Sequence, residues 1–365
     1  MTYRIFAINP GSTSTKIALY EGDWALVRRT IVHDEAALAA FEQIPDQLNF
    51  RIEAILRALD EAGEALTGID AYASRVSGLV GCASGVYQVN ERMLQHARIG
   101  YTIMHPASLG CQIAAAFAER FGGRALVVDP PESDELDEPA RMTGLKGVYR
   151  ESHLHVLNQK EVARRYAASV GKRYEDIDLV VAHLGGGITV GAHRRGRIVD
   201  ATDGVQGDGP LSPTRSDSLP ALHVIHLCMR ADADARQLAD RVSSRGGWLD
   251  HVGTSDLRKL IERMDAGDAQ ARRVYEATVR QVVKHIGAYA AVLEGRAEAI
   301  LLTGGLARSE RLAGDIGRHV GFLAKVKVYP GEFEMEALAA GARRVLDGEE
   351  AALEYSGVPV WSPPA

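Results

Sequence analysis

The sequence has 365 residues, enough for two domains, and its 46% hydrophobic and 25% charged residues are ordinary for a soluble globular protein. Its formal net charge of −6 excludes a general electrostatic attraction to nucleic acid or to anionic membranes. The sequence shows no signal pattern, no apolar run of the roughly 20 residues that span a bilayer, and no metal-ligand spacing among its cysteines. We expect a cytoplasmic protein with reduced cysteines, in which any phosphate binding is local.

The first half of the chain opens on a strand pattern, with short apolar or alternating runs separated by turn residues. A helical stripe of isoleucines and leucines and two buried apolar runs follow. In chain order, the predicted elements are strands at 4–8, 15–20 and 25–32, a helix at 49–66, a strand at 71–75, a helix at 107–121 and a strand at 125–129.

The second half repeats the opening pattern of strand, small-residue loop, strand, glycine turn and strand. The predicted elements are strands at 178–184, 188–193 and 197–200, helices within 219–293, strands at 299–303 and 324–329, and a helix at 334–346. The repeat indicates two related α/β domains, each presenting one tight hairpin loop. Two such loops facing each other across a cleft could clamp a polyphosphate.

The first of these loops carries phosphate-binding chemistry. Its sequence is Asn-Pro-Gly-Ser-Thr-Ser-Thr-Lys, from Asn9 to Lys16. Hydroxyl groups and exposed amides at a tight turn donate hydrogen bonds to phosphate oxygens, and Lys16 adds a positive charge. The loop is not a Walker A motif, because GxxxxGK[ST] is absent. On composition alone, a polar hairpin turn is an equally good interpretation.

Five segments in this order resemble the butyrate kinase branch of the acetate kinase family: INPGSTSTK, AHLGGG, GPLSPTRS, LTGGLA and YPGEFEMEALAAGA. The resemblance extends over about residues 4–347. It implies an α/β fold of two duplicated ribonuclease H-like (actin-like ATPase) domains with an interdomain cleft. We expect an N-terminal domain at 1–148, completed by a C-terminal helix at 335–365, and a C-terminal nucleotide-binding domain at 149–334.

The resemblance also implies roles for residues in both halves of the chain. In the first domain it implies phosphate binding by Asn9, Ser12, Ser14 and Lys16, substrate or phosphoryl binding by Arg75, and an active-site histidine at His105. It implies a catalytic Asp129 near Mg²⁺ and the reacting oxygen. It also implies a Mg²⁺ contact by Glu334, with Glu332 and Glu336 as alternatives for Glu334. In the second it implies catalytic roles for His155, His183 and Arg215, phosphate approach at Gly185, Gly186 and Gly187, and adenosine binding at Thr303, Gly304 and Gly305.

The activity that the resemblance implies is reversible transfer of the γ-phosphoryl group of ATP to a short-chain fatty acid, butyrate or a branched acid such as isobutyrate. ATP or ADP and Mg²⁺ are the expected cofactors. The expected partners are the small carboxylic acid and its acyl phosphate, with no nucleic acid and no membrane, in a homodimer or higher homo-oligomer. These residues suit the reaction, because two arginines and a histidine can neutralise negative charge as an anionic acid approaches a triphosphate.

Some segments depart from the family pattern. The sequences of residues 76–84 and 106–108 differ from the family pattern. In addition, Asp208, Leu211 and Thr214 stand where the family usually has Glu, Phe and Glu. We expect these segments to line the acyl pocket, so a branched, longer or substituted acid remains open, as do acetate and propionate. One methylene group in an apolar pocket is worth only about 1–3 kcal/mol, which favours overlapping activities.

Three other functions compete with this interpretation. A kinase of the same fold that phosphorylates a hydroxyl group would need a carboxylate base, and Asp129 could serve. An ATP-binding switch or polymer protein would need an appended domain or assembly insertions. An inactive relative is the third alternative, against which the retained Arg75, His183 and Arg215 argue.

Overall fold

The computed structural model describes residues 2–364, which form two compact units. Unit 1 contains the described residues of Met1–Asp134 and Phe333–Ala365, and unit 2 contains Glu135–Glu332. Residues 135–148, which the sequence assigns to the first domain, therefore group with unit 2. The domain limits given above, and the cleft between the domains, stay predictions.

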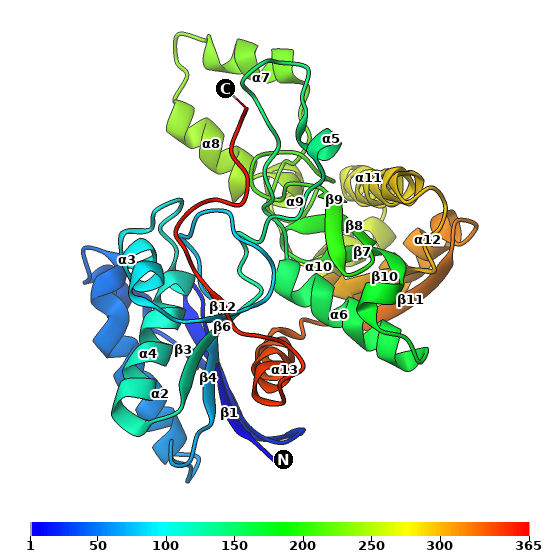
Figure 1. Cartoon of the computed structure of the whole chain (residues 1–365). Helices are drawn as coiled ribbons and strands as arrows, with labels where there is room; N and C mark the ends of the chain where they lie inside the picture. The colour runs from blue at the N-terminus through cyan, green and yellow to red at the C-terminus, as the bar shows by residue number, and fades with distance from the viewer. Residues whose placement is uncertain (1, 365) are drawn as a thin grey trace. The chain divides into compact units, whose positions relative to one another are not determined.

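Unit 1 is built on one sheet of seven strands in the order β12-β5-β6-β4-β1-β2-β3 (Figure 1). Its strands are β1 (Arg4–Pro10), β2 (Ser14–Glu21), β3 (Trp24–Val32), β4 (Ala71–Ser74), β5 (Val86–Gln88), β6 (Arg124–Val128) and β12 (Leu353–Glu354). Its helices are α1 (Glu35–Ala39), α2 (Leu48–Asp60), α3 (Glu91–Ile99), α4 (Leu109–Phe121) and α13 (Glu334–Leu346), with short 3₁₀ turns at Ile44–Gln47 and Pro106–Ser108.

The two faces of this sheet are covered by different helices. Phe6 and Ile8 of β1 pack with Ile55 of α2 and Ile113 of α4 in one apolar core. Helix α13 covers the opposite face (Figure 1), where an added Cβ at Gly341 would lie 2.4 Å from Val128. A small residue at this position therefore lets the C-terminal helix seat directly on β6.

Unit 2 is built on a sheet of five strands in the order β11-β10-β7-β8-β9. Its strands are β7 (Asp178–Leu184), β8 (Ile188–Arg194), β9 (Arg197–Ala201), β10 (Ala299–Gly304) and β11 (Lys325–Pro330). Its helices are α5 (Glu138–Arg141), α6 (Val156–Ser169), α7 (Ala221–Cys228), α8 (Ala235–Ser243), α9 (Gly247–Val252), α10 (Leu257–Asp265), α11 (Ala269–Val292) and α12 (Glu310–Val320), with 3₁₀ turns at Tyr174–Asp176 and Gly305–Arg308.

The repeated pattern in the sequence corresponds to two antiparallel meanders, β1-β2-β3 and β7-β8-β9. In each unit the middle strand pairs with both of its neighbours in sequence. The strand that opens each meander also pairs in parallel with a later strand, β1 with β4 and β7 with β10. The hairpin loops at residues 10–14 and 184–188 therefore lie at the carboxyl ends of parallel strands, the usual place for ligand binding in α/β proteins.

One predicted element is wrong in its length. The helix expected at 49–66 ends at Asp60. The backbone NH of Glu64 donates to the carbonyl of Leu59 at 3.0 Å, and Gly63 has a φ of 70°. This left-handed glycine closes the helix, as glycine does at many helix C-termini.

Candidate active site

The hairpin loop of unit 1 lies between β1 and β2. Its turn is closed by a hydrogen bond of 2.7 Å from the NH of Gly11 to the carbonyl of Ser14. The side chain of Ser12 is exposed and that of Asn9 is buried. Lys16 follows in β2, paired with Asn9 across the hairpin. These four predicted residues, Asn9, Ser12, Ser14 and Lys16, therefore belong to one short hairpin.

A buried arginine that the sequence analysis missed holds this loop. Arg51 of α2 is fully buried, and its Nη1 donates to the carbonyls of Gly11 (3.0 Å) and Ser14 (3.3 Å). Its Nη2 donates to the carbonyl of Ser12 at 3.4 Å. Burial lowers its pKa to about 10, so the guanidinium still carries its charge at neutral pH. The available signal was its position four residues before Ile55, on the apolar stripe of the helix.

A buried histidine beside Arg51 gives the fold a pH dependence. His33 contacts the Thr15 hydroxyl at 2.8 Å, and burial together with Arg51 lowers its pKa to about 4. The unfolded chain, with a histidine pKa near 6.5, takes up this proton first, so the stabilisation is complete above about pH 6.5 and is lost as the pH falls towards 4. We expect His33→Gln to reduce the loss of unfolding free energy between pH 7 and pH 4 by on the order of 2 kcal/mol in urea titrations. An unchanged acid sensitivity would contradict this assignment.

Three charged residues of unit 1 gather at the carboxyl ends of its parallel strands. Arg75 follows β4 and Asp129 follows β6, which lie side by side in the sheet. Glu334, the first residue of α13, accepts hydrogen bonds from Asn9 (2.6 Å) and from Arg75 (3.3 Å). Helix α13 therefore contributes a carboxylate to an edge that is otherwise made by the first 134 residues.

Asp129 lies in an unusual backbone conformation. Its φ is 39°, its side chain is 1% exposed, and its Oδ1 accepts from the NH of Gly85 at 3.0 Å. Positive φ is costly for a residue with a Cβ and is concentrated at functional sites. The strand ends at Val128, one residue before the predicted limit, because Asp129 turns out of the sheet.

His105 stays neutral in this setting. Its Nδ1 accepts from the NH of Ala107 at 3.1 Å, which puts the ring proton of the neutral form on Nε2. Burial, Arg75 and Arg51 together lower its pKa to about 4. A neutral imidazole here can donate a hydrogen bond without adding charge.

In unit 2 the hairpin loop Gly185–Gly187 joins β7 to β8 and is tied to the segment that carries Arg215. The NH and the hydroxyl of Thr214 both donate to the carbonyl of Gly186, at 3.1 and 3.0 Å. A Cβ on Gly187 would lie 2.3 Å from Nη1 of Arg215. The guanidinium therefore lies directly against the glycine backbone, which only a residue without a side chain permits.

Two histidines stack beside this loop. The rings of His155 and His183 have centroids 3.8 Å apart and an interplanar angle of 7°. His155 Nδ1 contacts the Thr189 hydroxyl at 2.9 Å. Asn158 Nδ2 lies 2.8 Å from His183 Nδ1, so the amide donates and the proton of the neutral imidazole sits on Nε2. The sequence analysis missed Asn158, because nothing local distinguishes it from other polar residues of α6.

A second missed residue is Asp217, which influences Arg215. It is 1% exposed with a φ of 53°, and its Oδ2 is buried with no hydrogen-bond partner within residues 2–364. Burial raises its pKa to about 7, against the opposing effect of the Arg215 guanidinium. The charge of the Asp217 carboxyl group, which acts electrostatically on Arg215, therefore changes near neutral pH. No motif marks this aspartate, because its environment is made by distant segments.

The remaining predicted residues of unit 2 close the end of β10. The Thr303 hydroxyl donates to the Gly331 carbonyl at 3.2 Å and accepts from Asn158, also at 3.2 Å. Gly304 has a φ of 93°, and a Cβ there would lie 2.3 Å from the Leu184 carbonyl. Gly305 begins the turn before α12, with open space at its Cβ position.

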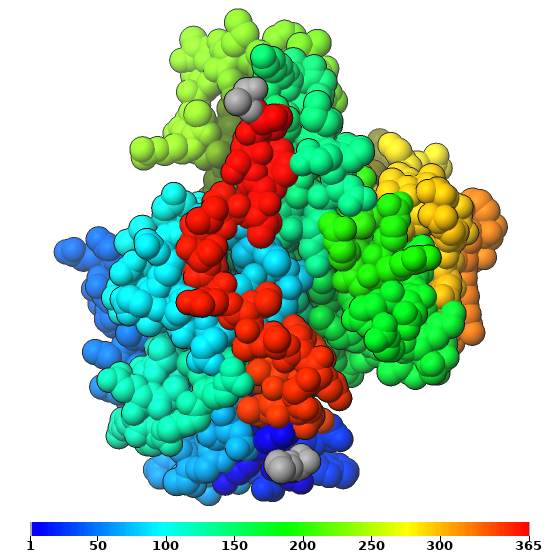
Figure 2. All heavy atoms as spheres, in the orientation of Figure 1, coloured from blue at the N-terminus to red at the C-terminus, as the bar shows by residue number. Residues whose placement is uncertain are grey.

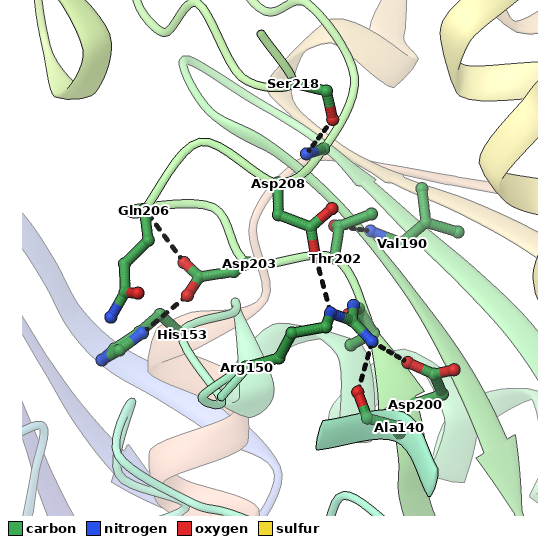
Figure 3. A network of polar contacts seen from close by, with 12 residues as sticks. Ala140, Arg150, His153, Val190, Asp200, Thr202, Asp203, Gln206, Asp208 and Ser218 are labelled. Atoms are coloured by element: carbon green, nitrogen blue, oxygen red, sulfur yellow. Dashed lines mark hydrogen bonds and ion pairs between the residues drawn. The ribbon is translucent and has the colours of Figure 1, made fainter. Parts of the chain in front are cut away.

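Besides Thr214, two further positions that depart from the family pattern have structural partners. Asp208 binds Arg150 at 2.8 Å, and Arg150 also binds Asp200 at 2.9 Å (Figure 3). In the same network, His153 contacts Asp203 at 3.0 Å. Leu211 is buried in the core of unit 2. These contacts anchor the loop that precedes Arg215 to the edge of the sheet.

The predicted residues thus form two groups, one in each unit. A model of the acetokinase family matches residues 132–347. A Clostridium botulinum protein described as a probable butyrate kinase is 40% identical over 355 residues, which are 97% of this chain and 100% of that relative. The chain belongs to the acetokinase family. Membership confirms the prediction of an ATP-dependent carboxylate kinase.

Solved structures extend this acetokinase comparison to the fold. The acetate kinase of Porphyromonas gingivalis superposes with a TM-score of 0.79 at 19% identity, covering 94% of this chain and 100% of that one. A propionate kinase from Francisella tularensis gives a TM-score of 0.75 at 16% identity, covering 93% and 98%. At these identities the likeness concerns the fold, and it confirms the predicted α/β class.

Other predictions are tested less directly. Family membership supports ATP or ADP as a substrate and a small-molecule partner. No helix within residues 2–364 combines the length and the apolar character needed to cross a membrane. The cytoplasmic location and the homo-oligomer stay predictions.

Proposed function

We propose that this acetokinase-family chain phosphorylates a short-chain fatty acid of about four carbons, butyrate or a branched acid such as isobutyrate, and that it also runs in reverse to make ATP. The observation that carries the proposal is one arginine near each hairpin loop. Arg75 shares Glu334 with Asn9 in unit 1, and Arg215 lies against Gly187 in unit 2. The 40% identity to a protein described as a probable butyrate kinase supports the choice of acid.

We propose the following division of roles. The acid's carboxylate oxygen attacks the γ-phosphorus as the bond to the β–γ bridging oxygen breaks, and no proton needs to move because the acid is already ionised. Arg75 would bind the acid or the moving phosphoryl group. Arg215, with His183 and His155 nearby, would neutralise the phosphoryl oxygens. Closure of the two predicted domains would exclude water and suppress ATP hydrolysis.

The nucleotide would bind on both loops. Asn9, Ser12, Ser14 and Lys16 would contact phosphates from unit 1, and the amides of Gly185–Gly187 would contact them from unit 2. Thr303, Gly304 and Gly305 would border the adenosine. Support comes from the hydroxyl-bearing turn of unit 1 and the all-glycine turn of unit 2, since hydroxyl groups and closely approaching backbone NH groups both donate to phosphate oxygens.

The residues present fit a bound Mg²⁺ ion. Within residues 2–364, no group of three or more histidine, cysteine or acidic side chains is arranged to hold a metal. That arrangement is normal for Mg²⁺, which keeps several waters and takes one or two carboxylates together with substrate phosphates. Asp129 and Glu334 would hold the ion, which supplies charge neutralisation at the phosphates. Glu336 pairs with Arg28, whereas Glu334 contacts Arg75 and Asn9 at the carboxyl ends of the strands, which favours Glu334 over Glu336 for this role.

We expect Asp129→Asn to raise the Mg²⁺ concentration for half-maximal activity by about tenfold or more, since metal-site substitutions typically cost 10–100-fold in affinity or activity. Asparagine keeps the oxygen that accepts from Gly85, so the fold should persist. Asp60→Asn, at the exposed end of α2, is the matched control. Unchanged Mg²⁺ dependence in Asp129→Asn would remove this residue from the metal site.

The test of function is a hydroxamate assay with ATP, Mg²⁺, hydroxylamine and acids from acetate to hexanoate, including isobutyrate and isovalerate. We expect ATP-dependent hydroxamate, with the highest kcat/KM for a four-carbon acid. The highest value with acetate or propionate would support a different acid within the same chemistry. No hydroxamate from any acid, despite ATP binding, would support a hydroxyl acceptor or an inactive relative.

A further inference from the structure

A groove on the outer surface of unit 2 lies between α11 and α12. Its volume is about 660 Å³, within the range of small-molecule sites. Figure 2 shows α11 in yellow adjoining α12 in orange at the surface. The lining shares no residue with the group around Gly185–Gly187 and Arg215. Both helices also pack into the core of unit 2, and Tyr275 and Val279 of α11 belong both to this core and to the lining.

The lining of the groove is strongly basic, although the whole chain is acidic. Five arginine and lysine side chains and one histidine line it, against two acidic side chains. Both ends of α12 contribute through Arg311 and Arg318, and α11 contributes three further cations, Arg272, Arg280 and Lys284. The formal charge of the lining is therefore +3 with the histidine neutral, in a chain of net charge −6.

Part of this charge is balanced within the protein. The Tyr275 hydroxyl donates to Asp315 at 2.5 Å, and Arg318 pairs with the same carboxylate. Arg311 pairs with Asp265 at 2.9 Å. Asp315, one of the two acidic residues of the lining, is thus satisfied by its own neighbours, and two of the five cations already have carboxylate partners.

The other three cations have no ion-pair partner within residues 2–364, although the second acidic residue of the lining, Glu276, lies four residues from both Arg272 and Arg280. Arg272, Arg280 and Lys284 form no ion pair with any residue that the structure describes, and all three are exposed on one face of α11. Arg280 and Lys284 are four residues apart, a spacing at which like charges destabilise a helix. The fold therefore accepts a repulsion that a bound anion would relieve. Between them lies an apolar floor of Tyr275, Val279 and Val283.

We propose that this groove binds a small organic molecule carrying two or more phosphate groups, at a site separate from that of the kinase reaction. Guanidinium groups match phosphate oxygens in a bidentate geometry, and the lysine adds a point charge. The net charge of the lining favours a polyanion over a monoanion. The apolar floor would contact the organic part of the ligand.

Hydrogen–deuterium exchange on the full chain with sodium tripolyphosphate and no divalent cation tests the proposal. We expect protection of peptides covering 272–284 and 311–319, with an affinity at least about tenfold above that for inorganic monophosphate. The double variant Arg280→Glu/Lys284→Glu should weaken this protection about tenfold or more while keeping the kinase activity and melting temperature of the parent. Arg273→Glu is the control, because Arg273 is exposed on α11 outside the groove.

Protection confined to peptides around 183–190 and 215 would overturn the proposal, since the probe would then occupy only the kinase site. Equal losses in Arg273→Glu and in the double variant would also overturn it, because they would indicate nonspecific attraction to a charged surface. Protection of the groove in a chain that yields no acyl hydroxamate would sustain this proposal while the proposed function fails.

Discussion

Replacing Arg215 with alanine should lower kcat for acyl phosphate formation by about 10³-fold or more, the range observed when an arginine that stabilises a transferring phosphoryl group is removed. The guanidinium lies against Gly187 and is buried enough to lower its pKa, so its charge acts in a poorly hydrated setting. Because its contribution is greatest in the transition state, kcat should fall far more than KM for ATP rises. Steady-state kinetics of the hydroxamate reaction measure both.

Two variants sharpen this result. Arg215→Lys keeps the charge but loses the planar fork, and should recover only part of the rate. Arg273→Ala, exposed on α11, should leave kcat unchanged. A kcat for Arg215→Ala within tenfold of the parent would exclude Arg215 from the chemical step.

Adding one methyl group at Gly187 should have an effect nearly as large. In Gly187→Ala the new Cβ would lie 2.3 Å from Nη1 and 2.7 Å from Cζ of Arg215, so the guanidinium must move. Displacements of about 1 Å from the reacting geometry can cost 10²-fold in rate, and we expect a kcat loss of that order. The melting temperature should change little, because the clash falls on the end of a side chain.

The neighbouring glycine supplies the control. A Cβ on Gly186 would meet only the Thr214 hydroxyl, at 3.9 Å, so Gly186→Ala leaves Arg215 in place. Full activity in Gly186→Ala with a loss in Gly187→Ala would assign the effect to Arg215. Equal losses in both would instead indicate that the bare backbone of the loop, and not the arginine, is what the reaction requires.

Local sequence patterns predicted those elements whose apolar spacing and flanking turn residues lie within a short segment. The strands of both meanders were located because apolar residues alternate or run together between glycine turns. The helix at 49–66 was drawn too long because Ala62 and Leu66 continue an apolar stripe, whereas the left-handed turn at Gly63 ends it. Helix α6 was not predicted, because its buried face includes Asn158, Gln159 and Lys160.

Three residues of the candidate site were missed for the same reason. Arg51, Asn158 and Asp217 act on groups far from them in sequence: the hairpin loop, His183 and Arg215. Charged and amide side chains are buried when tertiary structure supplies their partners, and a single sequence does not show those partners. The loop residues proposed to bind phosphate could be named from the sequence, because their hydroxyl, amide and amino groups lie at consecutive positions.

Helix α13 has a consequence for the order in which the protein becomes active during synthesis. The carboxylate of Glu334 contacts Asn9 and Arg75, and the helix covers the sheet formed by the first strands. A ribosome therefore makes all of unit 2 before it makes the helix that covers this face of the unit 1 sheet. An incomplete nascent chain holds the hairpin loop of unit 1 without its acidic partner. The arrangement delays assembly of the candidate active site until almost the whole polypeptide has been translated.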